Sequence, residues 1–260
     1  MIKRLFSDLR RYFPYSVAAA RAQLKAEVAD SYLNWIWWVL DPLCFMLIYT
    51  FIFGYVFKSS EQYFPVYIFI GLSMWTFFDR TLQGSVKLIK ANKAVVSKVY
   101  FPKFVLLMTR IWINGFKMMV SFGIVAVMML IWRIPLTWNV LYALPVFLTL
   151  GLLAFGIGCM LMHWGVYVND LSNVVSIVLK MMFYMTGIFY NVEKRIPEYG
   201  AILSRYNPAA FLLTSMRRCL IYGQAPSLKW LACWLAAGIA LSLLGAAVVY
   251  RAENNYVKAI

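Results

Sequence analysis

The sequence predicts an all-α polytopic membrane protein with six transmembrane helices, an N-terminal amphipathic interfacial helix, and short re-entrant or gate helices before the last span. Three observations predict this class. Hydrophobic residues make up 63% of the 260 residues, with a mean hydropathy of +0.72, whereas a soluble domain is about 45–50% apolar. Apolar runs close to the ~20 residues that cross a bilayer recur along the chain. Trp35, Trp37 and Trp38 precede the first run, as expected at a membrane–water boundary.

The individual elements follow from the apolar runs and the polar segments between them. Residues 1–30 alternate basic and apolar side chains, which predicts a helix lying in the plane of the membrane interface. Docking of a cytosolic partner is a compatible second use of that surface. Residues 31–260 form the transmembrane domain, and Asp41-Pro42 marks the start of its first span or a break in it. The spans are expected at about residues 38–57, 64–82, 104–132, 140–168, 171–190 and 228–250.

Two segments between the spans have a helical pattern of their own. Residues 85–103 carry several lysines and no acidic residue, interleaved with apolar positions, which predicts a basic amphipathic helix. Composition alone leaves open whether this is an ordinary positive cytoplasmic loop or a coupling helix for a soluble motor subunit. Residues 191–227 are too charged and too interrupted to span, so two short helices around Asn207-Pro208 are expected in a re-entrant or surface-lying hairpin.

The charge pattern predicts orientation rather than nucleic-acid binding. The net charge is +15, and the basic residues flank the apolar runs, as in membrane proteins that face anionic headgroups. Six spans place both termini on one side, and Lys and Arg favour the cytoplasm for that side. The four cysteines show no paired spacing and predict neither a disulfide nor a metal site.

Enzymatic signatures are absent from the sequence. It contains no G-x-x-x-x-G-K-[ST], H-E-x-x-H, G-x-S-x-G or C-x-x-C motif, so no nucleotide, metal or nucleophile site is predicted. The lone His163 has no ligand-type neighbour at metal spacing and is expected to be structural or interfacial. Acidic residues inside the spans are too sparse for coupling to an ion gradient, so the energy for any transport is expected from another chain.

Aromatic side chains form a candidate binding surface. Residues of the first span recur every four positions on one helix face, and a second group ends the fifth span, which also holds Lys180. Aromatic faces stack on sugar rings, although core packing or lipid contact is the alternative use. An intramembrane lysine is a functional-site candidate unless it only faces a water-filled cavity. The candidate channel residues are Phe45, Tyr49, Phe53, Phe57, Lys180, Phe183, Tyr184 and Tyr190.

Several motifs, in this order along the chain, resemble one known family. The basic N-terminus is followed by LNWIWWVLDPL (Leu33–Leu43), the basic linker, NDLSNVV (Asn169–Val175) and YNPAAFLLTSMRRCLIYG (Tyr206–Gly223). Over essentially its whole length the chain resembles the ABC-2 type permeases that export surface polysaccharides, the membrane subunits of O-antigen, teichoic-acid and capsule exporters. An ABC-2 type exporter of a small amphiphile such as a drug or lipid is the alternative. A membrane-embedded transferase would need clustered Asp, Glu or His, and a purely scaffolding chain would not explain Lys180 or the aromatic stripe.

The resemblance implies partners and roles. It implies a homodimer in the bacterial inner membrane, bound to two cytosolic ABC ATPase subunits that hold the ATP and Mg, with no cofactor in this chain. It implies a glycan on a polyprenyl pyrophosphate lipid as substrate, and a channel lined by the first and fifth spans. The implied lipid-headgroup or pyrophosphate contacts are Arg4, Arg10, Arg11, Arg21 and Lys25. The implied ATPase-coupling residues, in residues 85–103 and 169–173, are Lys87, Lys90, Asn92, Lys93, Lys98 and Asp170. The implied extracytoplasmic gate is Pro197–Ser204 and Ala209–Tyr222, with Asn207, Pro208, Arg217 and Arg218.

Overall fold

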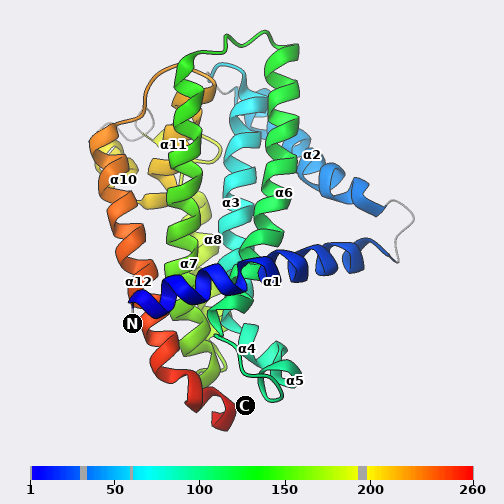
Figure 1. Cartoon of the computed structure of the whole chain (residues 1–260). Coiled ribbons are helices and arrows are strands. Elements are labelled where there is room, and N and C mark those ends of the chain that lie inside the picture. Colours follow the sequence, from blue (N-terminus) through cyan, green and yellow to red (C-terminus); the bar gives the residue numbers. More distant parts are fainter. Residues whose placement is uncertain (1, 30–33, 59–60, 193–197, 260) are drawn as a thin grey trace.

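The computed structural model describes residues 2–29, 34–58, 61–192 and 198–259, and over these residues it is helical without strands (Figure 1). The predicted all-α class is therefore confirmed. In chain order the helices are α1 (Ile2–Ala29), η1 (Asn34–Ile36), α2 (Trp37–Tyr49), η2 (Thr50–Val56), α3 (Phe64–Val86), α4 (Leu88–Ala91), α5 (Lys93–Val96), α6 (Phe104–Ile131), η3 (Trp138–Tyr142), α7 (Ala143–Tyr167), α8 (Leu171–Met185), α10 (Gly200–Tyr206), α11 (Pro208–Leu220) and α12 (Leu228–Ala259).

Four segments of the described chain are long and apolar enough to cross a membrane. They are Trp37–Val56, Phe104–Ile131, Trp138–Tyr167 and Leu228–Tyr256. By contrast, α8 is a shorter apolar helix of 15 residues, and α3 carries Asp79 and Arg80. The helical membrane class is thus supported by length and composition, while the count of six spans stays a prediction.

Helix α3 is the central element of the bundle. It packs against α2, α6, α7, α8 and α11, and most of its side chains are buried in the larger of two hydrophobic clusters. Because it is covered on several sides, its sequence reads as a continuous apolar run rather than as a one-sided stripe. Residues on α3 can consequently contact side chains from several other helices.

The α7–α12 pair shows why the fourth predicted span is rich in glycine. A Cβ built on Gly156 would lie 2.6 Å from the backbone carbonyl carbon of Leu241, and one on Gly245 would lie 2.7 Å from the carbonyl oxygen of Gly156. The two backbones can approach this closely only because neither residue has a side chain. Gly151 faces open space instead, so it does not contribute to this contact.

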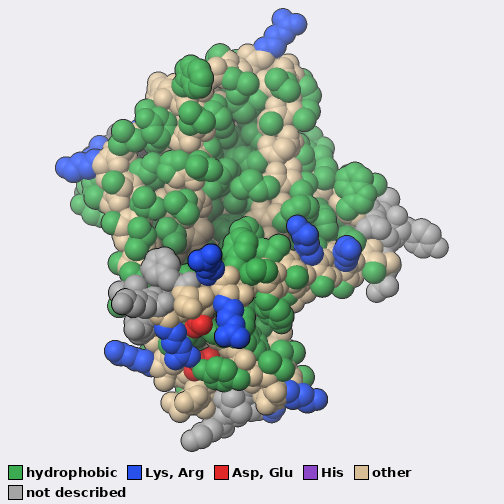
Figure 2. All heavy atoms as spheres, in the orientation of Figure 1, with side chains coloured by type: hydrophobic (Ala, Val, Ile, Leu, Met, Phe, Trp, Pro, Cys, Tyr) green, Lys and Arg blue, Asp and Glu red, His purple; other side chains and the backbone are tan. Residues whose placement is uncertain are grey.

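Helix α1 crosses the bundle and packs on α6 (Figure 1). Its buried side chains include Leu5, Ser16 and Ala20. The rings of Phe13 and Trp112 pack edge-to-face, with their centroids 5.3 Å apart. Figure 2 shows basic side chains gathered around this helix and below it, whereas the surface above is mostly apolar. The predicted amphipathic helix is present, with its apolar side held by protein contacts.

Two local predictions differ from the structure. The segment 85–103 holds two four-residue helices, α4 and α5, and not one continuous helix. The side-chain amide of Asn92 donates to the carbonyl of Leu88, a local bond that competes with helix continuation. The first predicted span ends in the π-helical turn η2, and not in regular α-helix. The two short helices predicted in 191–227 correspond to α10 and α11, while the predicted helix start at Pro197 lies outside the described residues.

Candidate functional site

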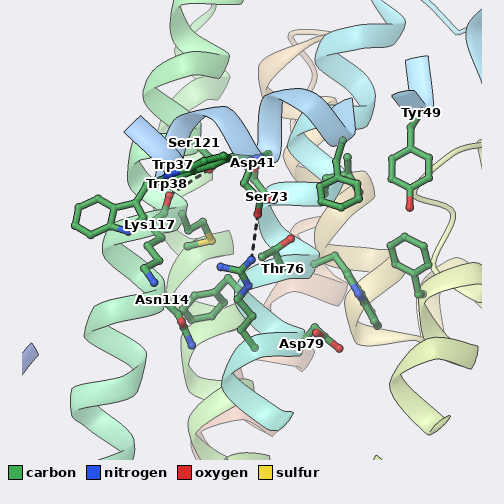
Figure 3. Close-up of a pocket in the computed structure, with 18 residues that line it drawn as sticks. Trp37, Trp38, Asp41, Tyr49, Ser73, Thr76, Asp79, Asn114, Lys117 and Ser121 are labelled. Atoms are coloured by element: carbon green, nitrogen blue, oxygen red, sulfur yellow. Dashed lines mark hydrogen bonds and ion pairs between the residues drawn. The ribbon is translucent and has the colours of Figure 1, made fainter. Parts of the chain in front are cut away.

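A candidate site is a pocket of about 300 Å³ lined by α2, α3, α6 and Phe183 of α8 (Figure 3). One part of its wall is aromatic. It comprises Trp37, Trp38, Phe45, Tyr49, Trp75, Phe77 and Phe183. The remainder includes charged and amide side chains from three helices. These are Asp41, Asp79, Arg80, Asn114 and Lys117. A pocket with flat apolar faces and a few placed polar groups suits a ring-shaped ligand that carries hydroxyl groups.

Ion pairs hold the polar wall in position. Arg80 Nη2 of α3 donates to Asp41 Oδ2 of α2 at 3.3 Å (Figure 3), and both side chains are about half exposed. Lys117 of α6 pairs with Glu27 of α1 and lies 5.9 Å from the ring centroid of Trp38. The amide nitrogen of Asn114 donates to the hydroxyl of Thr81 at 3.0 Å. Each of these three contacts links two helices, so the pocket shape depends on how α1, α2, α3 and α6 are arranged.

An aromatic ladder extends from this pocket along the membrane helices. The predicted four-residue stripe is real, because Phe45, Tyr49, Phe53 and Phe57 have successive ring centroids 5.5–6.3 Å apart. Phe189 joins the stripe to the end of α8. Its ring lies 4.5 Å from Phe53, 4.7 Å from Tyr49 and 5.2 Å from Phe183. The first span and the segment that follows α8 therefore share one aromatic surface.

The predicted channel residues divide into two groups. Phe45, Tyr49 and Phe183 line the pocket, and Phe53 continues the ladder. Phe57 and Tyr184 are largely exposed at 68% and 65% and lie outside the pocket lining. The hydroxyl of Tyr190 donates to the carbonyl of Tyr184 at 2.8 Å. Lys180 is exposed.

Sequence reasoning missed most of the polar wall. Asp79, Arg80 and Lys117 were not among the predicted site residues, yet all three line the pocket. A signal was present in the spacing. Ser73, Thr76 and Arg80 recur along one face of α3, and Asn114, Lys117 and Ser121 recur along one face of α6. Polar residues repeating on one face of an otherwise apolar helix indicate a shared polar cavity.

The predicted coupling residues gather at the end of the bundle that holds α4 and α5 (Figure 1). Lys90 Nζ donates to Asn169 Oδ1 at 2.6 Å, which joins the α3–α6 connection to the turn between α7 and α8. Lys87, Lys93, Lys98 and Asp170 are exposed. Asn92 is used locally, in its bond to Leu88. The two segments predicted as separate coupling contacts therefore form one surface.

The predicted gate residues have mainly structural partners. Asn207 Oδ1 accepts from the backbone amides of Ala209 and Ala210, and Pro208 occupies the first turn, so both residues start α11. Arg218 lines a second pocket beside α11. At the end of α11, Tyr222 donates to Glu61 Oε2 at 2.7 Å, and burial together with this bond raises the pKa of Tyr222.

Arg217 is almost completely buried, at 3% exposure. Its Nε donates to the carbonyl of Tyr67 in α3 at 3.1 Å, and Nη1 and Nη2 donate to the carbonyls of Gly187 and Ile188 at 2.8 Å each. The guanidinium carbon lies 3.5 Å from the ring centroid of Tyr67. Burial lowers the pKa of Arg217. This side chain fastens α11 to α3 and to the segment that follows α8.

The predicted headgroup residues of α1 also divide. Arg10, Arg11, Arg21 and Lys25 are exposed. Arg4 is exposed as well, and it belongs to a cluster with acidic and tyrosine side chains from its own helix, from α12 and from the segment after α5. Its partners are Asp8, Tyr100, Tyr250 and Glu253. The hydrogen bond to Tyr100 raises the pKa of Arg4, while burial lowers the pKa of nearby Lys103. Arg4 therefore ties α1 to α12 and to the segment after α5.

The other residues singled out in the sequence are His163 and the cysteines. His163 Nδ1 lies 2.9 Å from the Tyr256 hydroxyl, which agrees with the structural role expected for it. Within the described residues, no group of three or more His, Cys, Asp or Glu side chains could hold a metal ion. Cys159 and Cys219 are buried free thiols.

Comparisons with known proteins agree on one family. The model of the ABC-2 type transporter family matches residues 17–221. An O-antigen export system permease protein, RfbA, of Klebsiella pneumoniae is 24% identical over 253 residues, covering 96% of each chain. The RfbA protein of Myxococcus xanthus is 24% identical over 258 residues, covering 99% of each. The polysialic acid transport protein KpsM of Escherichia coli is 24% identical over 246 residues, covering 86% of this chain and 87% of its own.

Proposed function

The chain belongs to the ABC-2 type transporter family, and from that membership we propose that it is the membrane permease of a polysaccharide exporter. In this proposal it moves a lipid-linked polysaccharide, O-antigen first and otherwise teichoic acid or capsule, from the cytoplasmic to the outer side of the bacterial inner membrane. Relatives that it matches over nearly their full length are named as O-antigen export permeases. A relative named for polysialic acid transport widens the substrate class to capsule polymers.

The aromatic ladder is the observation that carries this proposal. Flat rings from α2, η2, α3 and α8, joined through Phe189, continue from a pocket whose other wall is charged and amide-bearing. A polymer of sugar rings needs a repeated apolar surface that tolerates sliding, together with polar groups that exchange hydrogen bonds with hydroxyls. The chain itself performs no reaction in this proposal, and ATP and Mg are held by a separate ATPase subunit.

Two further parts complete the proposed assembly. We place a second copy of the chain against the exposed apolar side of α2 and η2, which includes Leu47, Ile48 and Phe51. We place two ATPase subunits on the surface of Lys87, Lys90, Lys93, Lys98 and Asp170, on the side of the cytoplasmic termini. Arg10, Arg11, Arg21 and Lys25 are left exposed for the pyrophosphate of the lipid carrier, through charge-assisted hydrogen bonds.

Depletion of the protein tests the proposed activity directly. A finished polymer should accumulate on its lipid carrier at the cytoplasmic side and disappear from the cell surface. An unchanged distribution of lipid-linked glycans would reject polysaccharide export and favour the small-amphiphile alternative. Changing Arg10, Arg11 and Arg21 together to Ala should weaken export while the ATPase still copurifies.

The coupling surface has its own test. Lys90→Ala should lower substrate export without unfolding the protein, because a single side-chain bond between α4 and the α7–α8 turn is lost. Arg251→Ala, an exposed basic residue of α12, is the matched control. Equal export by the Lys90→Ala and Arg251→Ala variants would show that Lys90 has no role in coupling.

A further inference from the structure

The pocket between α2, α3 and α6 has a charge balance that distinguishes between kinds of sugar. Its lining contains two carboxylates and two cations, which are Asp41, Asp79, Arg80 and Lys117 (Figure 3). Arg80 Nη2 lies 3.3 Å from Asp41 Oδ2. Lys117 Nζ lies 2.5 Å from Oε2 of Glu27, which α1 contributes from outside the lining. Among the lining residues that the structure describes, each cation is therefore already engaged in an ion pair.

An acid group on a ligand would bring more negative charge than the two cations of this wall can balance. The half-exposed Arg80–Asp41 pair can open, but a sugar carboxylate that takes Arg80 leaves Asp41 without its cation beside the same cavity. An opened Lys117 pair leaves its own carboxylate unpaired in the same way. Asp79 adds a further carboxylate to the lining, whereas Lys180, the cation of α8, lies outside it. Like charges brought together with part of their water removed disfavour binding.

An uncharged sugar unit avoids this repulsion. A carboxylate offers about four lone-pair sites, and the bond from Arg80 occupies one oxygen of Asp41, so acceptors remain for sugar hydroxyl groups. Asn114 and Ser121 add an amide and a hydroxyl group to the wall, and the aromatic part of the lining supplies flat apolar faces. Hydroxyl groups can exchange hydrogen bonds with ion-paired side chains without changing the net charge of the pocket.

We propose that this pocket admits sugar units without an acid group and excludes uronic acids and sugar phosphates, because Asp41 and Glu27 keep its two cations occupied. This inference rests on the proposed function, which it deepens by naming the charge class of the polymer. It favours an uncharged glycan over teichoic acid and polysialic acid, whose repeating units carry phosphate or carboxylate groups.

The test measures the binding of two trisaccharides to the full chain in nanodiscs of zwitterionic lipid. Maltotriose is the uncharged probe, and trigalacturonic acid is the acidic probe of the same length. The wild type should bind maltotriose, and its affinity for trigalacturonic acid should be lower by roughly tenfold or more. Equal affinities for the two probes, tighter binding of the acidic probe, or no binding of either would overturn the proposal.

Two variants should gain affinity for the acidic probe. Asp41→Asn releases Arg80, and Glu27→Gln releases Lys117. Each variant should bind trigalacturonic acid several-fold more tightly than the wild type does, and the gain should shrink as salt rises. Asp41→Asn combined with Arg80→Gln removes the released cation and should return the affinity to the wild-type level. Because unfolding cannot produce a gain of binding, the result does not depend on equal stability of the variants.

Glu198→Gln is the matched control, because it removes one negative charge at an exposed position outside the pocket lining. It should bind both probes as the wild type does. An equal gain in this control, or the absence of a gain in both Asp41→Asn and Glu27→Gln, would refute the assignment.

Export in cells separates failure of this inference from failure of the proposed function. If the wild type exports a glycan with an acid group in every repeating unit, only the charge selection is refuted. If depletion of the protein leaves the lipid-linked glycans unchanged, polysaccharide export itself is refuted, whatever the binding measurements give.

Discussion

Replacing Arg217 with alanine should destabilise the protein more than any other single change of a charged residue in the α10–α11 region. The substitution removes three donors at once, from the carbonyls of Tyr67, Gly187 and Ile188. It also removes the cation from the face of the Tyr67 ring. A short side chain cannot reach any of these groups, so α11 loses its polar connection to both α3 and the segment after α8.

The magnitude follows from burial. A buried acceptor left without its donor costs about 1–3 kcal/mol, so three such carbonyls set a range of about 3–9 kcal/mol before any offset. Part of the loss is offset because the guanidinium itself was expensive to bury, as the lowered pKa of Arg217 indicates. The expected net loss is about 3–4 kcal/mol, or about 10 °C in melting midpoint for a chain of this size.

The assay is thermal unfolding of the purified protein in detergent. Arg217→Lys should lie between the wild type and Arg217→Ala, because one ammonium can serve only part of the three-carbonyl site. Arg251→Ala, at an exposed position of α12, controls for loss of a positive charge and should melt within about 2 °C of the wild type. Equal midpoints for Arg217→Ala and Arg251→Ala would refute the argument that this guanidinium fastens α11.

Three further outcomes are expected. Asp41→Asn should change the free energy of unfolding by less than about 1 kcal/mol, because the ion pair with Arg80 is half exposed. It should nevertheless lower export, because Asp41 lines the pocket. Unfolding and export measured on one preparation check this, and a large loss of stability would contradict it. Phe189→Ala should lower the free energy of unfolding by about 3–5 kcal/mol, because the ring is buried against Phe53, Tyr49 and Phe183. Phe189→Leu should keep most of the stability and still reduce export. Normal export by Phe189→Leu would argue against a role for the ring itself. The folded-state pKa of Tyr222 is raised above its unfolded value, so the folded state is favoured while the phenol stays protonated, and stability should decline as pH rises above about 10. Tyr222→Phe should reduce that decline in thermal melts taken across this pH range. An identical pH profile for the wild type and the variant would contradict the assignment.

The sequence predicted the features that depend on local pattern. Hydropathy predicted the helical membrane class, and the i, i+4 spacing of Phe45, Tyr49 and Phe53 predicted a stripe that the structure contains. Helical periodicity predicted the short helix after Asn207-Pro208, and the structure shows that the Asn207 cap and Pro208 begin it within a few residues. These signals need no knowledge of the tertiary arrangement.

Features that depend on distant partners were not predictable. Arg217 binds backbone carbonyls located 150, 30 and 29 residues away, and a carbonyl carries no sequence signature. Arg4 was expected at lipid headgroups, but its partner Glu253 lies near the opposite end of the chain. The segment 85–103 was expected as one helix because its overall amphipathic pattern conceals the local bond of Asn92 that interrupts it.

Helix α11 and the aromatic ladder are physically connected through adjacent residues. Arg217 of α11 holds the carbonyl of Ile188, and Phe189, the next residue, is the ring that joins the first-span stripe to Phe183. Gly187, with a φ of +73°, gives the backbone the turn that presents both carbonyls to the same guanidinium. A displacement of α11 that breaks these hydrogen bonds therefore also releases the segment carrying Phe189. Opening at α11 and loosening of the ladder are consequently expected to occur together, because one buried side chain maintains both.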